Sequence, residues 1–424
     1  MRFFSILLLC FALKPGLAQN LQPLFTVEEA VSLAIKNNPR VSASVQDITA
    51  ASLGVRSAKA LVNPTFYIAP SVPNANGAPD ALLFSQPLEL NGTRSARTGV
   101  ASAQLRATQA RSLTELRSVV FEVKSAYYEL ARARELLSLS QDLLKTSEEF
   151  DRIARRQVEL GKRPGIDLAQ TGIEVARVLQ QVSLAESRVL TSSIALNTLL
   201  DRNTEEPIGT LAAFPTPSDL GDKETLIRGA LLSRAEITVE DALRQSYLQQ
   251  ARLAKAEGRP DLAPQFRSNE IVRSFSPRDY GFSVAVTLPL FDWGSRRNRV
   301  RQAEGSASAQ ADRLTATQNQ VRQEVEQALV RVRASETLLN SYRQGILDRA
   351  KRLLDAAKIG LQEGAVGTTL LTVLEAQRIY RTVQTEYANA QSDSTLSRVE
   401  LERALGTVPV SLFPQTRPNT RRSK

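Results

Sequence analysis

An internal duplication constrains this chain more than any other feature of its sequence. The stretch "PLELNGTR" at 87–94 returns as "PLFDWGSR" at 289–296, a step of 289 − 87 = 202 residues. Two earlier matches have steps of 260 − 64 = 196 and 232 − 37 = 195 residues: "AKALVNPTF" (58–66) with "AKAEGRPDL" (254–262), and "NNPRVSAS" (37–44) with "LSRAEITV" (232–239). Repetition in this order predicts two copies of one structural unit.

Each copy contains a long stretch that favours helix. No proline occurs between Pro87 and Pro164, or between Pro289 and Pro409, so no proline forces a break there. Apolar residues recur every seven positions in both stretches: Leu116, Val123, Leu130, Leu137 and Leu144, then Val325, Val332, Leu339, Ile346 and Leu353. This spacing predicts seams between packed helices. Roughly seventy helical residues would give a rod on the order of 100 Å long.

Each rod is expected to turn back on itself. Gly161 and Gly364 occupy positions where a helix C-cap favours a residue that tolerates positive φ. Asp167 in the first copy, and Thr368 or Thr369 in the second, are candidate N-caps of the returning helices. The returning helices should end near 203 and 406, so each copy holds an antiparallel hairpin of long helices.

Between its short opening helix and its rod, each copy has strand character. "YGFSVAVTLPLF" (280–291) alternates apolar residues with small or polar ones, and "APQFRSNEIVRSFSP" (263–277) supplies a partner strand. The first copy offers "PTFYIAP" (64–70) and "ALLFSQPLEL" (81–90). Such strands fit either a half-buried sheet or a membrane barrel with a wet interior. Four strands cannot close a barrel alone, so membrane insertion would require several chains to share one.

Composition narrows the possible functions. The 424 residues include no His, and the only Cys is Cys10, so His-dependent acid–base chemistry and Cys–His nucleophiles are excluded. Residues 1–18 combine Arg2, an apolar run and a small residue at Ala18, which predicts a cleaved secretory signal peptide. Cys10 is not expected to carry a lipid. The net charge of +10 is mostly dispersed along helical stretches and indicates solvated faces.

Several stretches together resemble the outer membrane efflux proteins, the TolC-like channels, and among them the CzcC-type components. They are "FTVEEAVSLAIKNNPRV", "LVNPTF", the twice-used "PLELNGTR" and "PLFDWGSR", "LGKRPGIDLA", "EGAVGTTLLTVLEAQR", and the closing "ALNTLLD" and "RALG". They cover nearly the whole chain after the signal peptide. Each motif is weak alone, but their order, repeated twice, is specific.

The resemblance implies a mainly α fold with a small β part. Three protomers would each contribute four strands to a twelve-stranded barrel in the outer membrane, and the long helices would form a periplasmic α-barrel. The implied function is that of an exit duct in a tripartite RND-type efflux system. The duct would pass metal cations or drugs from an inner-membrane transporter through a membrane-fusion adaptor. The resemblance implies neither catalysis nor a cofactor.

The resemblance also implies two sets of site residues. The helical turns would form the periplasmic tip, which contacts the adaptor or gates the tunnel: Gly161, Pro164, Asp167, Gly364, Gly367 and Thr368. The strand-to-helix junctions would lie near the membrane surface: Pro87, Gly92, Arg94, Pro289, Gly294 and Arg296. The second turn, "GAVGTTLL", has no carboxylate, which argues against an acidic gate there.

The expected domains are a first repeat at 19–214, a second at 215–414, and a basic disordered tail at 415–424. Within the repeats we expect strands at about 64–90 and 262–291 and long helices at about 92–203 and 294–406. Two alternatives stay open. A soluble periplasmic coiled-coil adaptor or structural protein would explain the heptads but not the strand hairpins. A nucleic-acid binder would fit the net charge, but the signal peptide and the dispersed arginines argue against it.

Overall fold

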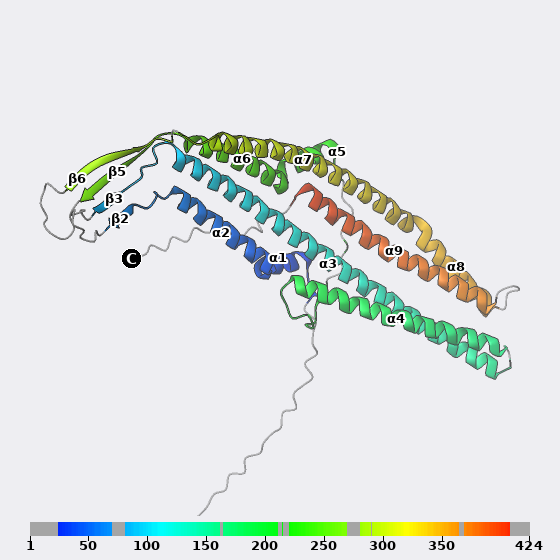
Figure 1. Ribbon diagram of the computed structural model, residues 1–424. Helices are drawn as coiled ribbons and strands as arrows, with labels where there is room; N and C mark the ends of the chain where they lie inside the picture. The colour runs from blue at the N-terminus through cyan, green and yellow to red at the C-terminus, as the bar shows by residue number, and fades with distance from the viewer. Residues whose placement is uncertain are drawn as a thin grey trace, which may run out of the picture.

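The long helices lie side by side, with a small sheet at one end of the molecule and the ends of two pairs of long helices, α3 with α4 and α8 with α9, at the other (Figure 1). This computed structural model describes residues 24–69, 81–161, 164–210, 214, 220–268, 280–289, 291–363 and 369–407. The two predicted sets of site residues therefore belong to opposite ends of the molecule.

The same order of elements occurs twice, which confirms the tandem repeat. The first copy contains α1 (Val27–Asn37), α2 (Pro39–Lys59), β2 (Thr65–Ala69), β3 (Ala81–Ser85), α3 (Thr93–Glu159) and α4 (Gly165–Leu199). The second contains α5 (Lys223–Ser233), α6 (Ala235–Ala256), β5 (Asp261–Ser268), β6 (Tyr280–Thr287), α7 (Ser295–Ser341), a π-helical turn (Tyr342–Ile346), α8 (Leu347–Gln362) and α9 (Leu370–Leu405). Two short strands, β1 (Leu24–Phe25) and β4 (Gly209–Thr210), pair in parallel beside α3.

The two predicted strand hairpins join into one antiparallel sheet with the order β2-β3-β5-β6. The copies meet where β3 pairs with β5, with Ser85 opposite Gln265. Four phenylalanines lie directly opposite one another across all four strands and so share one face: Phe66, Phe84, Phe266 and Phe282. The sheet therefore has an apolar face, much of it exposed, and Phe282 is 87% exposed.

The predicted seams are buried along the first part of each long helix. Leu116, Val123 and Leu130 are at most 4% exposed in α3, and the matching positions of α7 are at most 3% exposed: Val325, Val332 and Leu339. Further along, the expectation for the second copy is wrong. Ile346 and Leu353 are 40% and 46% exposed, whereas Leu354 is 6% exposed. The seam has moved by one residue.

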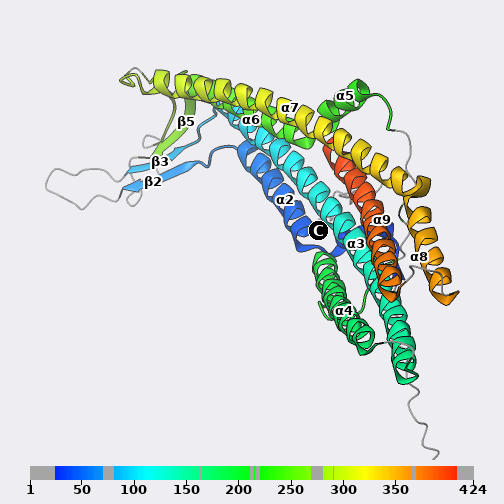
Figure 2. The same cartoon turned by 90° about the vertical axis from the view of Figure 1, so that its right-hand side faces the viewer.

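A π-helical turn explains this shift. Gly345 has φ of 141° inside the turn Tyr342–Ile346, and the helix axis changes direction where α7 passes into α8 (Figure 2). The step between copies is 339 − 137 = 202 residues before this turn and 364 − 161 = 203 after it. A π turn accommodates one additional residue in a helix. The expectation of an unbroken second rod is therefore wrong, because the helix is interrupted at a glycine rather than at a proline.

The short helices of the two copies begin in the same way. Asn38 and Arg234 are the N-cap residues of α2 and α6, with nearly identical φ and ψ angles. Asn38 Nδ2 donates to the carbonyl of Leu199 at 2.9 Å, and Arg234 Nη1 donates to that of Ala404 at 3.0 Å. Their separation is 234 − 38 = 196 residues, so the 195-residue alignment of these stretches was wrong by one residue.

Candidate functional site

At the sheet end, a glycine with positive φ precedes each long helix. Gly92 and Gly294 are the N-cap residues of α3 and α7, with φ of 90° and 84°. A neighbouring side chain fixes each turn: Asn91 Oδ1 accepts from the amide of Thr93 at 3.0 Å, and Asp292 Oδ1 accepts from that of Gly294 at 3.1 Å. The chain thus bends from strand to helix at the two glycines that the sequence indicated.

The two junction prolines do not terminate the sheet in the same way. Regular pairing of β3 ends at Ser85, but the amides on either side of Pro87 still donate to carbonyls of β5, at 3.1 and 3.0 Å. Pairing therefore continues past Pro87, because this proline stands where no donor toward β5 is required. Pro289 lies two residues beyond the last residue of β6.

The junction arginines hold the ends of the short helices. Arg94 Nε donates to the carbonyl of Lys59, the last residue of α2, at 2.7 Å. Arg296 Nη1 donates to the carbonyl of Gly258, just beyond α6, at 3.2 Å. Both arginines thus donate to a backbone carbonyl at or just after the end of the preceding short helix, which gives them a structural role. Their position near a membrane surface stays a prediction.

At the opposite end, the first helical turn agrees with the sequence only in part. Gly161 has φ of 69°, as a C-cap glycine should. The N-cap of α4 is Pro164, and Asp167 is the third residue of the helix, so the N-cap role expected for Asp167 is wrong. A carboxylate in the first turn is nevertheless favourable beside the positive end of the helix dipole.

The second helical turn lies largely outside the described residues, as do Gly364, Gly367 and Thr368. Of the two threonines proposed as N-caps, Thr369 has this role for α9. It forms a reciprocal capping box with Thr372: the Thr369 side chain accepts from the Thr372 amide at 3.3 Å, and the Thr372 side chain accepts in return at 3.4 Å.

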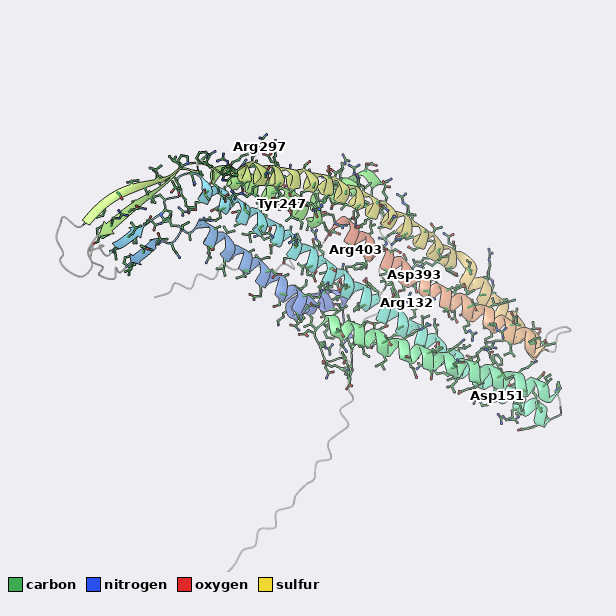
Figure 3. The ribbon with its side chains drawn as sticks, viewed as in Figure 1. Arg132, Asp151, Tyr247, Arg297, Asp393 and Arg403 are labelled. Atoms are coloured by element: carbon green, nitrogen blue, oxygen red, sulfur yellow. The ribbon has the colours of Figure 1, made fainter. Side chains whose placement is uncertain are left out.

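Polar contacts between the two helical hairpins were not anticipated from the sequence. Arg381 of α9 lies 3.5 Å from a Glu174 carboxylate oxygen and 3.4 Å from the amide oxygen of Gln181, both on α4. Burial lowers the pKa of Arg381, and the charge of Glu174 opposes this change. Nearer the sheet, Arg132 of α3 and Asp393 of α9 are 3.3 Å apart (Figure 3). These pairs hold the hairpins together along their length.

A cleft of about 370 Å³ lies between the hairpins beside Arg381. It is lined by Leu136, Leu139, Ser140, Gln181, Leu184, Ala185, Arg188, Arg381, Thr382, Gln384, Thr385 and Glu386. The lining mixes leucines with arginines and glutamine, so the hairpins are less tightly packed here than in the core. Relative movement of the hairpins would change this cleft first.

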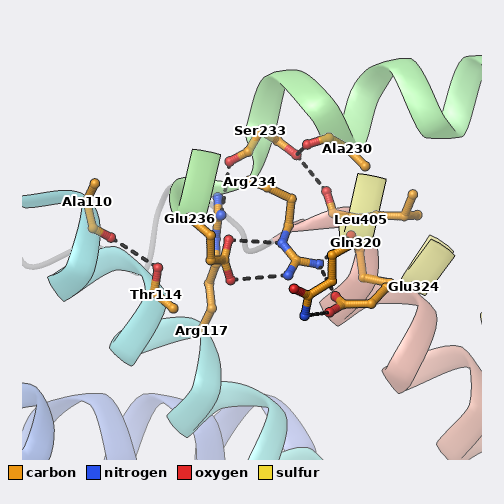
Figure 4. A network of polar contacts seen from close by, with 11 residues as sticks. Ala110, Thr114, Arg117, Ala230, Ser233, Arg234, Glu236, Gln320, Glu324 and Leu405 are labelled. Carbon is orange, nitrogen blue, oxygen red and sulfur yellow. Dashed lines mark hydrogen bonds and ion pairs between the residues drawn. The ribbon is translucent and has the colours of Figure 1, made fainter. Parts of the chain in front are cut away.

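A buried charge network joins the copies midway along the molecule. Arg234 donates to Glu236 at 3.0 Å and to Glu324 at 2.9 Å, while Arg117 of α3 donates to the Ser233 carbonyl at 3.0 Å (Figure 4). The side chain of Arg234 is only 8% exposed. Five helices meet here: α3, α5, α6, α7 and α9.

Within the described residues, no cluster of three or more His, Cys, Asp or Glu side chains is arranged to hold a metal ion. Among the helices that the structure describes, none combines the length and the apolar character needed to cross a membrane.

Two repeats of long helical hairpins that share one antiparallel sheet define the fold of the outer membrane channels with periplasmic helical extensions. The chain belongs to the outer membrane efflux protein family, whose model matches residues 30–202 and 226–407. It is an outer membrane efflux channel.

Individual relatives agree with this assignment. The cobalt-zinc-cadmium resistance protein CzcC of Cupriavidus metallidurans is 25% identical over 397 residues, which cover 90% of both chains. The CmeC outer membrane channel of Campylobacter jejuni superimposes with a TM-score of 0.77 at 18% identity, over 90% of this chain and 85% of that one. The outer membrane protein VceC of Vibrio cholerae gives a TM-score of 0.74 at 19% identity, over 90% and 96%. The CzcC-type and TolC-like resemblance is confirmed.

Proposed function

We propose that this channel is the exit duct of a tripartite efflux system and works as a homotrimer. It conducts solutes passively from an inner-membrane RND transporter, which it reaches through a periplasmic membrane-fusion adaptor. The observation that carries the proposal is the four-stranded sheet, in which β2 pairs only with β3 and β6 only with β5 among the described residues. The two outer edges differ, so a contact between copies runs head to tail, and such a contact forms a ring when the rotation between copies closes.

The two faces of the sheet support a barrel with lipid outside and water inside. The face that carries the phenylalanine row also carries Val284 and Val286, which are 62% and 54% exposed. The opposite face of β6 carries Gly281, Ser283 and Thr287. Apolar residues outward and small or polar residues inward are the pattern of membrane barrels. Three copies of four strands give twelve, an even number above the minimum of about eight.

The hairpin turns support an adaptor contact and a gate at the far end. The helix ends that flank the two turns, those of α3 and α4 and those of α8 and α9, lie at the end of the molecule away from the sheet (Figure 1). We assign the adaptor contact and the constriction to the turn residues named from the sequence: Gly161, Pro164, Asp167, Gly364, Gly367 and Thr368. The contacts of Arg381 with Glu174 and Gln181 would fix the position of one hairpin against the other when the gate is closed.

For the cargo we propose divalent metal cations. The support is the likeness to CzcC, which is named for cobalt, zinc and cadmium resistance and matches along 90% of its length. A passive duct needs no metal ligands of its own, because selection of the solute takes place at the pump.

Expression in a Gram-negative host tests the assembly and the cargo separately. The mature chain should be recovered in the outer membrane fraction, and its detergent-extracted mass should be three times that of the single chain. A host that lacks the gene should retain several times more zinc than the complemented strain after a zinc load. A soluble periplasmic monomer would contradict the proposed exit duct. Unchanged zinc retention with a normal trimer would contradict only the proposed cargo.

Asp167→Ala should leave trimer assembly intact and lower the single-channel conductance for K⁺ about twofold at low salt, because one carboxylate per protomer is removed. The effect should be smaller at high salt, because salt screens the attraction between these carboxylates and K⁺. Planar-bilayer recordings at two salt concentrations measure the change. Asp142→Ala, which removes an exposed carboxylate from α3 away from the turn, is the matched control. Equal conductance for wild type and Asp167→Ala would confine Asp167 to stabilising the start of α4.

A further inference from the structure

Most of the net charge of the chain lies in one band of the molecule, where the helices meet the sheet. This basic band comprises residues 54–61, 86–101, 250–261 and 288–301, which are the last turns of α2 and α6, the first turns of α3 and α7, and their connections to the strands (Figure 1). It contains 11 Lys and Arg and 4 Asp and Glu, a net charge of 11 − 4 = +7, against +10 for the whole chain. A band of one sign of charge attracts a partner of the opposite sign.

Part of this charge is not neutralised within the chain. Arg97 pairs with Glu89 at 2.7 Å, and Arg299 pairs with Glu257 at 2.6 Å. Among the described residues, no carboxylate pairs with three other arginines of the basic band, all of them exposed: Arg56, Arg252 and Arg297. The basic band therefore keeps positive charge that an anion from outside the chain can neutralise.

The packing of the helices does not account for these three arginines. Helix α6 has α3 on one side and α7 on the other, and Arg252 is exposed on it nevertheless. Arg56 is the equivalent residue of the first copy, 252 − 56 = 196 residues earlier. Arg297 is the third residue of α7, at the sheet end (Figure 3), where the helix dipole disfavours a cation. An unpaired cation at such a position indicates an anionic partner.

Between the arginines and the strands, the exposed side chains become aromatic and then aliphatic. Trp293, the only tryptophan of the chain, is 96% exposed and has φ of 50°, an unfavourable value for a bulky side chain. Phe291 is 83% exposed, and Val286 of β6 is exposed as well. Beside α2, the exposed Leu61 and Phe66 follow Arg56 in the same order. A membrane presents phosphate, interface and acyl chain in this sequence, and tryptophan favours the interface.

A groove on the sheet adds a place for an acyl chain. It has a volume of about 400 Å³ and lies between Phe84, Phe266 and Phe282. Its lining extends to Gln86, which immediately precedes the junction residue Pro87. A soluble anion would contact only the arginines, whereas a lipid can also cover this apolar surface. The groove therefore favours a phospholipid over free phosphate.

We propose that the basic band binds the phosphate groups of anionic phospholipids in the periplasmic leaflet of the outer membrane. Arg56, Arg252 and Arg297 contact the phosphates, Trp293 lies at the level of the lipid glycerol, and the acyl chains cover the apolar face of the sheet. This inference rests on the barrel proposed above, which places the sheet in the bilayer and the helices on its periplasmic side. Each arginine near an anionic membrane surface should strengthen binding about fivefold.

Native mass spectrometry of the mature chain in a nonionic detergent tests the proposal, with phosphatidylglycerol and phosphatidylcholine of identical acyl chains offered in equal amounts. Wild type should retain phosphatidylglycerol in preference by about fivefold or more, and Arg56→Gln combined with Arg252→Gln should lower this preference at least about threefold. The matched control, Lys351→Gln combined with Arg352→Gln, removes the same charge from exposed positions of α8 and should behave as wild type. The same preference in both double variants, or none in wild type, would overturn the proposal.

The same spectra separate this inference from the proposed assembly. A trimer without lipid preference would contradict the lipid site alone, whereas a monomer would contradict the assembly and the lipid site with it. Inorganic phosphate added at constant ionic strength should leave the bound phosphatidylglycerol in place. Its displacement would show that the basic band binds free phosphate instead of a lipid.

The fluorescence of Trp293 gives a second measurement that requires no substitution. In vesicles whose phospholipids carry bromine atoms near the headgroup, the emission of Trp293 should be strongly quenched relative to vesicles of the unbrominated lipid, because the tryptophan lies at the interface. Equal emission in the two kinds of vesicle would show that Trp293 does not contact the lipid, and would overturn its place in the proposed site.

Discussion

Replacing Arg234 with methionine is expected to lower the free energy of unfolding by about 3–5 kcal/mol, because it leaves Glu236 and Glu324 without their buried partner. Arg234 also donates to the carbonyl of Ala404, so the variant removes a contact between α6 and the end of α9 as well. Chemical denaturation of the detergent-solubilised protein, followed by circular dichroism, measures the loss.

The control for this experiment lies on the same helix. Arg244 forms an exposed ion pair with Asp241 one turn away, and Arg244→Met should cost only about 0–1 kcal/mol. Adding Glu236→Gln and Glu324→Gln to Arg234→Met should recover part of the loss, because neutral amides do not leave buried charge unpaired. Equal stability of Arg234→Met and Arg244→Met would show that the network contributes nothing beyond surface pairing.

The same network gives stability a pH dependence with a definite sign. Burial would raise the pKa of Glu236, but its hydrogen bonds with Arg234 and with its own backbone, and the charges of Arg234 and Arg117, outweigh burial and lower it. A carboxyl group whose pKa is lowered by folding stabilises the protein at pH values above its unfolded-state pKa of about 4.3. This stabilisation is lost as the pH falls through its folded-state pKa. Wild type should therefore lose more stability than Arg234→Met on acidification below about pH 4.

The second large effect is expected at Gly345, where a substitution and a deletion should differ in their effect on stability. Gly345→Ala keeps the additional residue but places a β-carbon at φ of 141°, and should destabilise the protein by about 1–3 kcal/mol. Deletion of Gly345 removes the residue that sets the two copies out of step. Leu354 would then fall fourteen positions after Leu339, two full heptads, so an uninterrupted helix could bury both.

We therefore expect the deletion variant to be at least as stable as Gly345→Ala, and its helix to be straight through this region. Thermal unfolding compares the stabilities, and the distance between spin labels on α7 and α8 reports the bend. Gly172→Ala, at an exposed helical position of α4 where a β-carbon meets nothing in the chain, is the control for substitution itself. A deletion variant less stable than Gly345→Ala would mean that the π turn is required for packing.

The sequence predicted those parts of the fold that depend on local chemistry and on repetition. The resemblance placed the strand-to-helix junctions at Gly92 and Gly294, which the sequence repeats, and both glycines have positive φ in the structure. The N-cap of α9 could be narrowed to Thr368 or Thr369 from their place between a glycine-containing turn and an apolar run, and the structure assigns it to Thr369. The alternation in β6 predicted its two faces correctly.

The sequence predictions failed at positions where a distant contact or a competing residue determines the local structure. Ile346 and Leu353 fit the heptad pattern, but the π turn at Gly345 rotates the following helix. A single glycine inside a polar stretch does not predict a π turn. Asp167 is a good N-cap residue, yet Pro164 starts the helix three residues earlier. Glu324 is 90 residues from Arg234, and Gln181 is 200 residues from Arg381, and no local pattern indicates such pairs.

The outer edges of β2 and β6 also determine at which stage of its biogenesis the protein is most prone to aggregate. Within the part of the chain that the structure describes, the outer edges of β2 and β6 have no strand partner and lie next to exposed phenylalanines, a combination that templates aggregation until other copies arrive. Aggregation is therefore most favoured between export of the chain and its assembly, and a low concentration of chains prolongs this interval. Quality control in the periplasm should recognise this sheet rather than the helices, which are already packed in the single chain. A defect in ring closure would appear first as degraded or aggregated chains.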